Sequence, residues 1–261
     1  MNNLQFDKEL LTRSLPSGFD VETTLSHFSI ITYMVDPKLL RPLVHERFEL
    51  DCIITPKGEQ KALISIVPFW DLDFRLVKFP WIKKSFGQTN YRAYVTDSIT
   101  GEHVAWFFGT SLDSFSVNFP RYIWNLPWHK TKMKFDVNYD HDLKKYTSYK
   151  INSHSKWANL NIELEDTGKP PKTLLGFSDL ETGLVLLTHP LKGFFYLRNG
   201  KLGSYSIWHD KLNPTEGHIS NADISLLQKL GLATKTEPLE IHSVLIQHQT
   251  NFTVYLPPVA L

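Results

Sequence analysis

A chain of 261 residues with 42% hydrophobic and 21% charged residues is long enough to bury a core without disulfides or metals. Its 28 basic and 27 acidic residues leave a formal net charge of +1, and no basic run stands out, which argues against a nucleic-acid partner. Aromatic residues make up 13% of the chain and favour strands and the walls of an apolar pocket. The composition predicts one β-rich domain over residues 1–261.

Cysteine content and apolar runs indicate where the chain resides. Cys52 is the single cysteine and cannot form an internal disulfide, and the N-terminal run MNNLQFDKELL lacks the features of a secretory signal. No apolar run approaches the roughly 18 to 20 residues that span a bilayer. We therefore expect a cytoplasmic protein with no membrane partner.

The first half of the chain contains one short helix signal and several strand-like runs. Asp36 can cap a helix whose first position is Pro37. A turn at 56–58 separates the first strand-like run from the second and predicts that these two form a hairpin. The runs are FELDCIIT (48–55), QKALISIVPFW (60–70), QTNYRAYVT (88–96) and HVAWFFGTS (103–111).

The second half continues with alternating runs and two further helix signals. Runs at 130–137, 145–152 and 156–164 alternate with period two and predict a meander. The Asn199-Gly200 step predicts a hairpin with a type I′ turn. Helices are expected over SDLETGLVLLTH (178–189), with Ser178 and Glu181 in capping-box spacing, and over SNADISLLQKLGL (220–232), with Ser220 as its cap. The last run, 238–256, reads as a strand.

These elements predict an α+β fold that is mostly antiparallel β, a cone-like barrel or wrapped sheet with a few short helices. Several runs, in this order, resemble the YqjF-like family of uncharacterised bacterial proteins, which is grouped with the acetoacetate decarboxylase-like fold. The resemblance implies a large antiparallel sheet wrapped around a small-molecule cavity. It is carried by RPLVHERFELD (41–51), ALISIVPF (62–69), TNYRAYV (89–95), VAWFFGTSLDS (104–114), YIWNLPWHKTKM (122–133) and SIWHDKL (206–212).

This chain differs from the acetoacetate decarboxylases that it resembles at the step that carries their nucleophile. Acetoacetate decarboxylases use a lysine in a Pro-Lys-Lys step, whose free amine attacks a ketone. The matching step here carries Arg121 and Tyr122 after Pro120, and arginine cannot lose its proton to form a Schiff base. The parallel N–H donors of the Arg121 guanidinium suit a carboxylate, so we expect Arg121 and Tyr122 to line the pocket. In the alternative, Arg121 pairs with a surface carboxylate and Tyr122 packs on the next turn.

A polar row on one predicted strand gives a second set of ligand-binding candidates. Asn90, Arg92 and Tyr94 are spaced two apart in QTNYRAYVT and therefore share one face of the strand. In a closed barrel one face of each strand points inward, which would place this row in the cavity. The row can equally form the outer, hydrated face, and the sequence leaves the two orientations open.

Histidines and lysines offer fewer candidates. The 11 histidines include no HxH or HxxxH pair, so no metal site is predicted. His209, beside Asp210, is a candidate acid or base, although a histidine bonded to backbone at a hairpin end is the simpler interpretation. The alternating lysines at 130, 132 and 134 are expected to face solvent.

Two aspartates near the end of a predicted strand are a further candidate pair. Asp71 and Asp73 flank Leu72, and paired carboxylates can perform acid and base chemistry. A solvated turn is the default interpretation of such a pair.

The sequence thus favours a pocket protein that binds a small molecule bearing a carboxylate or carbonyl group, with no cofactor. The usual nucleotide, phosphate, serine-hydrolase and dithiol motifs do not occur. Whether the protein is an enzyme, and whether it forms a homo-oligomer, stays open. The alternative is a non-enzymatic ligand-binding or protein-interaction domain whose aromatic residues form only a core.

Overall fold

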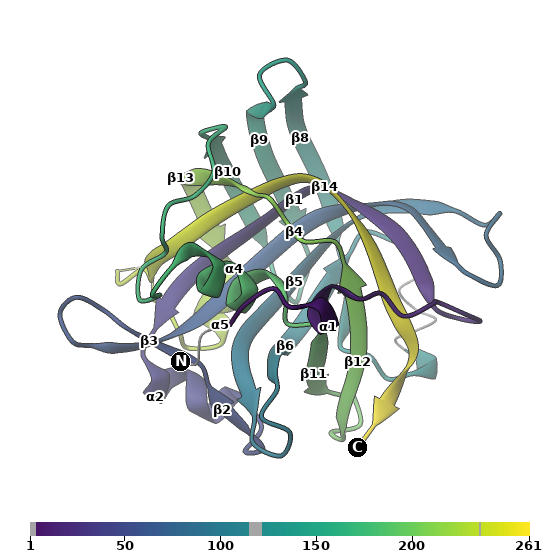
Figure 1. Cartoon of the computed structure of the whole chain (residues 1–261), viewed down its shortest axis with the longest axis horizontal. Helices are drawn as coiled ribbons and strands as arrows, with labels where there is room; N and C mark the ends of the chain where they lie inside the picture. The colour runs from purple at the N-terminus through teal and green to yellow at the C-terminus, as the bar shows by residue number, and fades with distance from the viewer. Residues whose placement is uncertain (1–3, 115–121, 235) are drawn as a thin grey trace.

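A computed structural model describes residues 4–114, 122–234 and 236–261, and most of them lie in strands (Figure 1). The strands are β1 (Val21–Val35), β2 (Phe48–Leu50), β3 (Cys52–Ile54), β4 (Gln60–Leu76), β5 (Lys84–Asp97), β6 (His103–Leu112), β7 (Trp128–Lys130), β8 (Lys132–Asp140), β9 (Lys145–His154), β10 (Leu160–Asp166), β11 (Lys192–Tyr196), β12 (Leu202–His209), β13 (Thr215–Ile224) and β14 (Glu240–Ala260). The short helices are α1 (Lys8–Leu11), α2 (Pro37–Leu40), the 3₁₀ turn η1 (Arg41–Leu43), α4 (Leu180–Thr188) and α5 (Ser225–Lys229). The predicted fold class, mostly antiparallel β with a few short helices, is confirmed.

Seven of these strands close into a ring. Their order is β1-β4-β5-β6-β11-β12-β14, and β14 pairs again with β1. Strand β14 closes the ring because its 21 residues pair with β1 along most of their length and with β12 near the C-terminal end. Neighbouring strands of the ring are antiparallel except β6 and β11, which are parallel. Figure 1 shows β1, β4 and β14 as long curved strands across the molecule.

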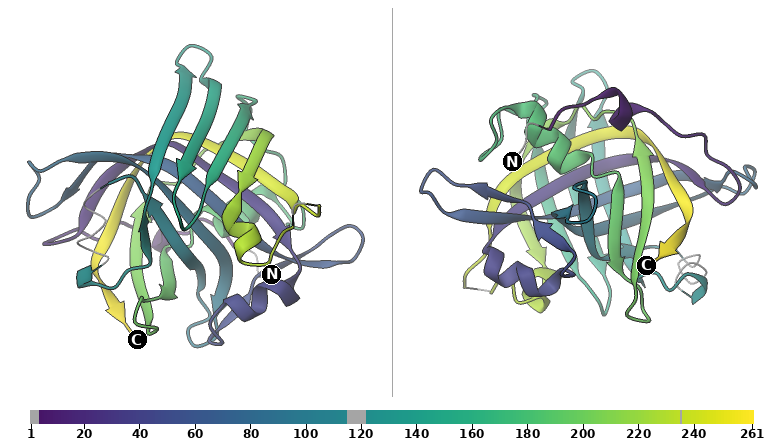
Figure 2. Two further views of the ribbon diagram at one scale, coloured as in Figure 1. Left: turned by 180° about the vertical axis from the view of Figure 1, so that it is seen from behind. Right: turned by 60° about the horizontal axis from the view of Figure 1, so that its bottom comes forward.

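The remaining long strands form an extension that covers the outer face of the ring. Strands β13, β10, β9 and β8 continue the sheet from β14 (Figure 2). Their apolar residues share one core cluster with the outward-facing residues of β5, such as Tyr91 and Ala93 with Tyr149 and Ile162. The odd-numbered positions of β5 are therefore buried between two layers of strands, and its even-numbered positions face the inside of the ring.

Helix α4 packs against that inner face. Leu184 and Leu187 lie in one cluster with Leu25, Phe69 and Tyr94, which come from three strands of the ring. The helix therefore covers part of the inner face of the ring.

Its start differs from the predicted capping box. Asp179 is the N-cap and accepts a hydrogen bond from the Thr182 backbone N–H at 2.7 Å, while Ser178 donates to Asp179. Because the helix is capped by Asp179, one residue later than predicted, Ser178 and Glu181 do not form the box.

Two other local predictions were wrong. Residues from Ser220 to Ile224 belong to β13, because they pair with β10, and α5 begins only at Ser225. Gly200 has φ +83°, but Asn199 does not have a positive φ, so the turn between β11 and β12 is not type I′. The Asp36 cap, the first hairpin and the meander were predicted correctly.

No helix in the described ranges is long and apolar enough to cross a membrane.

Candidate functional site

The inner face of the ring encloses a chamber of about 60 Å³. A cavity needs roughly 10 to 15 Å³ to hold one water molecule, so this chamber has room for a small organic group. Residues spaced two apart on each strand line it, which is the pattern of strand faces that point inward. They include Val21, Thr23 and Leu25 of β1, Phe69 and Asp71 of β4, Gln88, Asn90 and Arg92 of β5, Tyr205 and Ile207 of β12, and Phe252 and Val254 of β14.

Arg92 is the one cation that lines the chamber within the described residues, and its side chain is 6% exposed. Its Nη2 donates to the Leu187 carbonyl at 2.8 Å, near the C-terminal end of α4, where a helix attracts positive charge. Its Nε has no hydrogen-bond partner, and no carboxylate among residues 4–114, 122–234 and 236–261 pairs with it. Arg92 is thus a buried cation whose Nε–H group can donate a hydrogen bond to a ligand.

The Asn90 side chain is oriented by two neighbours. Gln88 Nε2 donates to its Oδ1 at 3.0 Å, and Thr110 Oγ1 donates to the same oxygen at 2.9 Å. With its oxygen engaged twice, the amide presents Nδ2 as the group that can donate to a ligand. Gln88 lines the chamber as well and continues the polar row of β5. Its position two residues before Asn90 places Gln88 on the same strand face, although it was not among the predicted site residues.

Tyr94, the third predicted member of the row, lies beyond the chamber. It is fully buried, its hydroxyl donates to the Leu187 carbonyl at 3.1 Å, and it lies 2.7 Å from Ser65 Oγ. The structure therefore places the row on the inner face, with Asn90 and Arg92 at the chamber and Tyr94 beneath α4.

Asp71 also lines the chamber and is 2% exposed. Thr23 Oγ1 donates to its Oδ1 at 3.2 Å, and its Oδ2 has no partner in the described part of the chain. Burial raises the pKa of this carboxyl to about 8, and the hydrogen bond from Thr23 opposes that rise only in part. At neutral pH the carboxyl is mostly protonated and can donate a hydrogen bond into the chamber.

The default interpretation of Asp71 and Asp73 as a solvated turn was wrong for Asp71. Strand β4 runs on to Leu76, so Asp71 lies within it, and the register shifts just after Asp71. Asp73 sits at that irregularity with φ +59° and pairs with Lys83 at 2.7 Å. The two carboxyl groups therefore occupy different environments and do not act as a pair.

The chamber is elongated along β5. Asp71 pairs in register with Phe86, six residues before Arg92. At about 3.3 Å per residue this corresponds to roughly 20 Å along the strand. One small ligand cannot touch both ionisable groups, so Arg92 and Asp71 mark opposite ends.

His209 is bonded to backbone, as the simpler of its two interpretations expected. Its Nδ1 lies 2.8 Å from the Asp210 carbonyl oxygen and its Nε2 lies 2.9 Å from the Thr188 carbonyl oxygen. The neighbouring carboxylate does not hold its charge, because burial lowers the pKa of His209 more than its hydrogen bonds raise it. The ring stacks on Phe252 and is not part of the chamber lining.

Of the two candidates taken from the decarboxylase-like step, the structure describes only Tyr122. Arg121 falls outside the described residues, so its place stays a prediction. Tyr122 is 66% exposed, lies under the Arg198 guanidinium at 5.2 Å and does not line the chamber. The lysines at 130, 132 and 134 are exposed, as expected.

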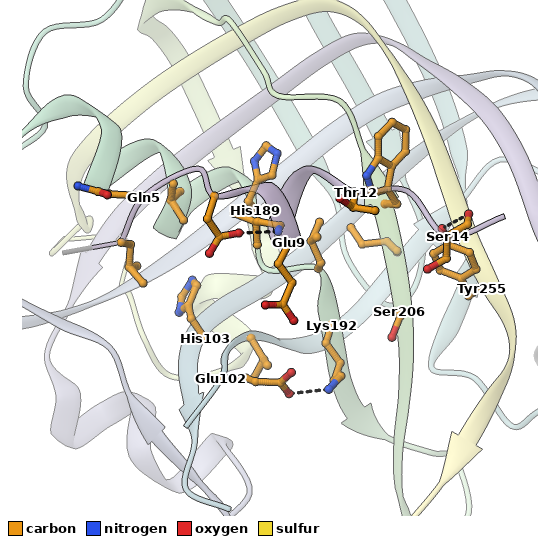
Figure 3. Close-up of a pocket in the computed structure, with 18 residues that line it drawn as sticks. Gln5, Glu9, Thr12, Ser14, Glu102, His103, His189, Lys192, Ser206 and Tyr255 are labelled. Carbon is orange, nitrogen blue, oxygen red and sulfur yellow. Dashed lines mark hydrogen bonds and ion pairs between the residues drawn. The ribbon is translucent and has the colours of Figure 1, made fainter. Parts of the chain in front are cut away.

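A larger groove of about 760 Å³ lies beneath the N-terminal segment that carries α1 (Figure 3). Many of its polar side chains are engaged with one another or with the chain nearby. Lys192 pairs with Glu102 at 2.5 Å, and His103 contacts Asp51 at 2.6 Å. Trp208 Nε1 donates to the Leu11 carbonyl, which ties the segment to β12. The groove therefore lies between the N-terminal segment and the strands on which this segment packs.

No cluster of three histidine, cysteine or acidic side chains that could hold a metal ion occurs in the described residues.

Comparison with known structures supports the fold seen here. The enduracididine biosynthesis enzyme MppR complexed with pyruvate is similar with a TM-score of 0.59 and 11% identity, over 95% of this chain and 91% of that one. An acetoacetate decarboxylase from Legionella pneumophila has a TM-score of 0.57 and 17% identity, over 96% and 91% of the two chains. An acetoacetate decarboxylase-like enzyme from Sphingomonas wittichii RW1 has a TM-score of 0.57 and 10% identity, over 94% of each chain. The fold is acetoacetate decarboxylase-like, as the sequence resemblance implied.

Sequence comparison gives the family. No match was found among curated protein sequences. One family model matches residues 22–247, which include most strands of the ring and the whole extension. On this match the chain belongs to the family described as DUF2071, an uncharacterised conserved protein family (COG2071).

Proposed function

We propose that the inner chamber binds a small molecule through a carboxylate or carbonyl group, which Arg92 holds and Asn90 orients. The observation that carries the proposal is the state of Arg92, a buried guanidinium whose Nε is unpartnered and which has no carboxylate partner in the described ranges. A buried charge is unfavourable unless it is paired and hydrogen-bonded. A ligand carboxylate would supply both the charge and the acceptors.

The donors at this end of the chamber suit such a group. Arg92 Nε and Asn90 Nδ2 are both N–H donors on one strand face, two residues apart, and a carboxylate or carbonyl oxygen accepts from either. The neighbour MppR has been captured with pyruvate, which carries both a carboxylate and a ketone. We therefore take 2-oxo acids as the first ligands to test.

The proposal assigns binding and no covalent step. No lysine is among the described residues that line the chamber, and the step that resembles the decarboxylase nucleophile carries Arg121. Without a neutral amine at the ligand, a Schiff base has no nucleophile. The rival function, a domain whose aromatic residues form only a core, would leave Arg92 without a ligand-binding role.

Calorimetric titration of wild type and Arg92→Met with pyruvate, acetoacetate and phenylpyruvate tests the proposal. Because a hydrogen bond to a charged group contributes about 1.5 to 3 kcal/mol, the substitution should weaken the affinity for each bound acid by about 10- to 150-fold. The methyl esters of the same acids lack the negative charge, so they should bind wild type weakly and respond little to the substitution.

Tyr94→Phe is the matched control. It removes the other donor to the Leu187 carbonyl, and so weakens the same contact with α4, without altering the chamber lining. We expect its ligand affinity to stay within about twofold of wild type. The proposal is wrong if acids and esters bind equally well, or if Arg92→Met and Tyr94→Phe change acid affinity alike.

A further inference from the structure

A second, apolar compartment adjoins the chamber. Its volume is about 390 Å³, within the range of about 300 to 1,000 Å³ that small-molecule sites occupy. Apolar side chains from the ends of several ring strands and from the loop after β4 form most of its wall. Those that matter most here are Phe74, Phe79, Ile82, Phe86, Trp124 and Trp128.

The two compartments share a wall. Val21, Phe74, Trp128 and Leu256 line both of them. Asp71 lines the inner chamber close to this junction, since Val21 and Phe74 lie near it on β1 and β4. The inner chamber therefore adjoins the apolar compartment at the end opposite Arg92.

One row of β5 leads from one compartment to the other. Phe86 lines the outer compartment, and Gln88, Asn90 and Arg92 line the chamber, all at two-residue spacing on one strand face. Along this row the side chains change from apolar to amide to cation over roughly 20 Å. A ligand complementary to the whole row has an apolar body and an anionic head.

We propose that the outer compartment takes the apolar tail of the ligand, and that the ligand class is an amphipathic carboxylic or 2-oxo acid with a straight-chain or aryl tail. This inference rests on the proposed function, because it places the acid head at Arg92. Lys84 and Arg75 line the outer compartment and give its wall positive charge, which favours the entry of an anion. Arg75 also pairs with Glu22 at 3.2 Å, so Lys84 carries most of this effect.

A series of straight-chain 2-oxo acids of increasing length, titrated into wild type by calorimetry, tests the tail. Burial of each added methylene contributes about 0.8 kcal/mol, so affinity should rise about fourfold per methylene until the compartment is filled. Primary alcohols of the same lengths are the matched ligands without the acid head and should bind far more weakly.

Ile82→Glu introduces a charge into the wall of the outer compartment at a side chain that is 54% exposed. It should weaken the longest acids by tenfold or more and leave pyruvate unchanged. Ile54→Glu is the control, because Ile54 is 57% exposed, belongs to β3 and does not line the outer compartment. It should leave the whole series unchanged.

The outcomes separate the two proposals. If short acids bind through Arg92 but affinity does not depend on chain length, the tail proposal is wrong and the proposed function stands. If long acids and long alcohols bind equally well, Arg92→Met has no effect and short acids do not bind, the head group is wrong and the proposed function fails with it. An equal loss of affinity in Ile82→Glu and Ile54→Glu would also contradict the tail proposal.

Discussion

At the scale of single residues, the chamber holds two ionisable groups, Arg92 and Asp71, whose surroundings differ. Arg92 donates a hydrogen bond to the Leu187 carbonyl near the end of α4. Asp71 accepts one hydrogen bond at Oδ1, and its Oδ2 has no partner among the described residues. Burial raises the pKa of Asp71 to about 8, so this carboxyl is best satisfied as a protonated donor. A protonated acid at one end and a cation at the other distinguish the site from a plain apolar core.

Protonation of Asp71 should make stability depend on pH. The unfolded carboxyl ionises near its ordinary pKa of 3.8, whereas the folded carboxyl keeps its proton until about pH 8. The unfolded state is therefore favoured progressively across this window, and the free energy of unfolding should fall as pH rises, by at most about 1.4 kcal/mol per pH unit. Asp71→Asn cannot ionise, so it should remove this component and be more stable than wild type at pH 7. Urea unfolding at pH 5, 7 and 9 measures both effects.

Asp73→Asn serves as the control for this experiment. Asp73 is partly exposed and paired with Lys83, and asparagine tolerates its positive φ. It should follow the pH dependence of wild type. The assignment of Asp71 would be refuted by an Asp71→Asn protein whose stability falls with pH as steeply as that of wild type.

Part of the site could be predicted from the sequence. The two-residue spacing placed Asn90 and Arg92 on one face of a strand, but only closure of the ring decides that this face points inward. Asp71 could not be distinguished from a turn residue, because β4 continues past the irregularity at Asp73. Burial of a charged residue depends on partners far away in sequence, here β1 and β14.

At the scale of elements, an irregularity in the pairing of β5 and β6 lies beside Arg92. Tyr91 pairs with Gly109 and Arg92 pairs with Phe107, so one residue of β6 is left unpaired between them. Bulges of this kind bend a strand and change the direction of nearby side chains. Gly109 has φ +154°, and a Cβ there would lie 2.7 Å from the Trp157 ring.

Gly109→Ala should therefore disturb the strand that supports the site. Overpacking at a filled position typically lowers stability by about 1 to 3 kcal/mol. Gly101→Ala is the comparison, because Gly101 has φ +73° and open space around it, whereas Gly109 combines the clash with a φ that is nearly confined to glycine. We expect Gly109→Ala to lose about 1 to 3 kcal/mol more than Gly101→Ala in urea unfolding. Equal losses would show that Trp157 does not pack against this bulge as described.

Element boundaries were predicted best where local chemistry decides them. The Asp36 cap and the hairpin around 56–58 depend on neighbouring residues, and both were confirmed. The run from Ser220 has a helical cap signal, but pairing with β10 extends β13 through Ile224. Long-range pairing outweighed local propensity there, and a single sequence does not reveal it.

At the scale of the whole molecule, ring closure and the outer extension together create the chamber. The ring brings even-numbered positions of β5 together with β1, β12 and β14, while β8, β9 and β10 cover its other face (Figures 1 and 2). The acetoacetate decarboxylase-like neighbours share the fold at 10 to 17% identity, and this likeness leaves the chemistry to the residues of the chamber. In this chain those residues are the basis of the proposal that Arg92 binds an anion.

The most direct test of this account is a crystal structure of the protein in complex with the 2-oxo acid that binds best in titration. The account predicts a carboxylate oxygen within about 3 Å of Arg92 Nε, and a second ligand oxygen at similar distance from Asn90 Nδ2. An acid bound in the groove beneath the N-terminal segment, with Arg92 Nε still unpaired, would contradict it.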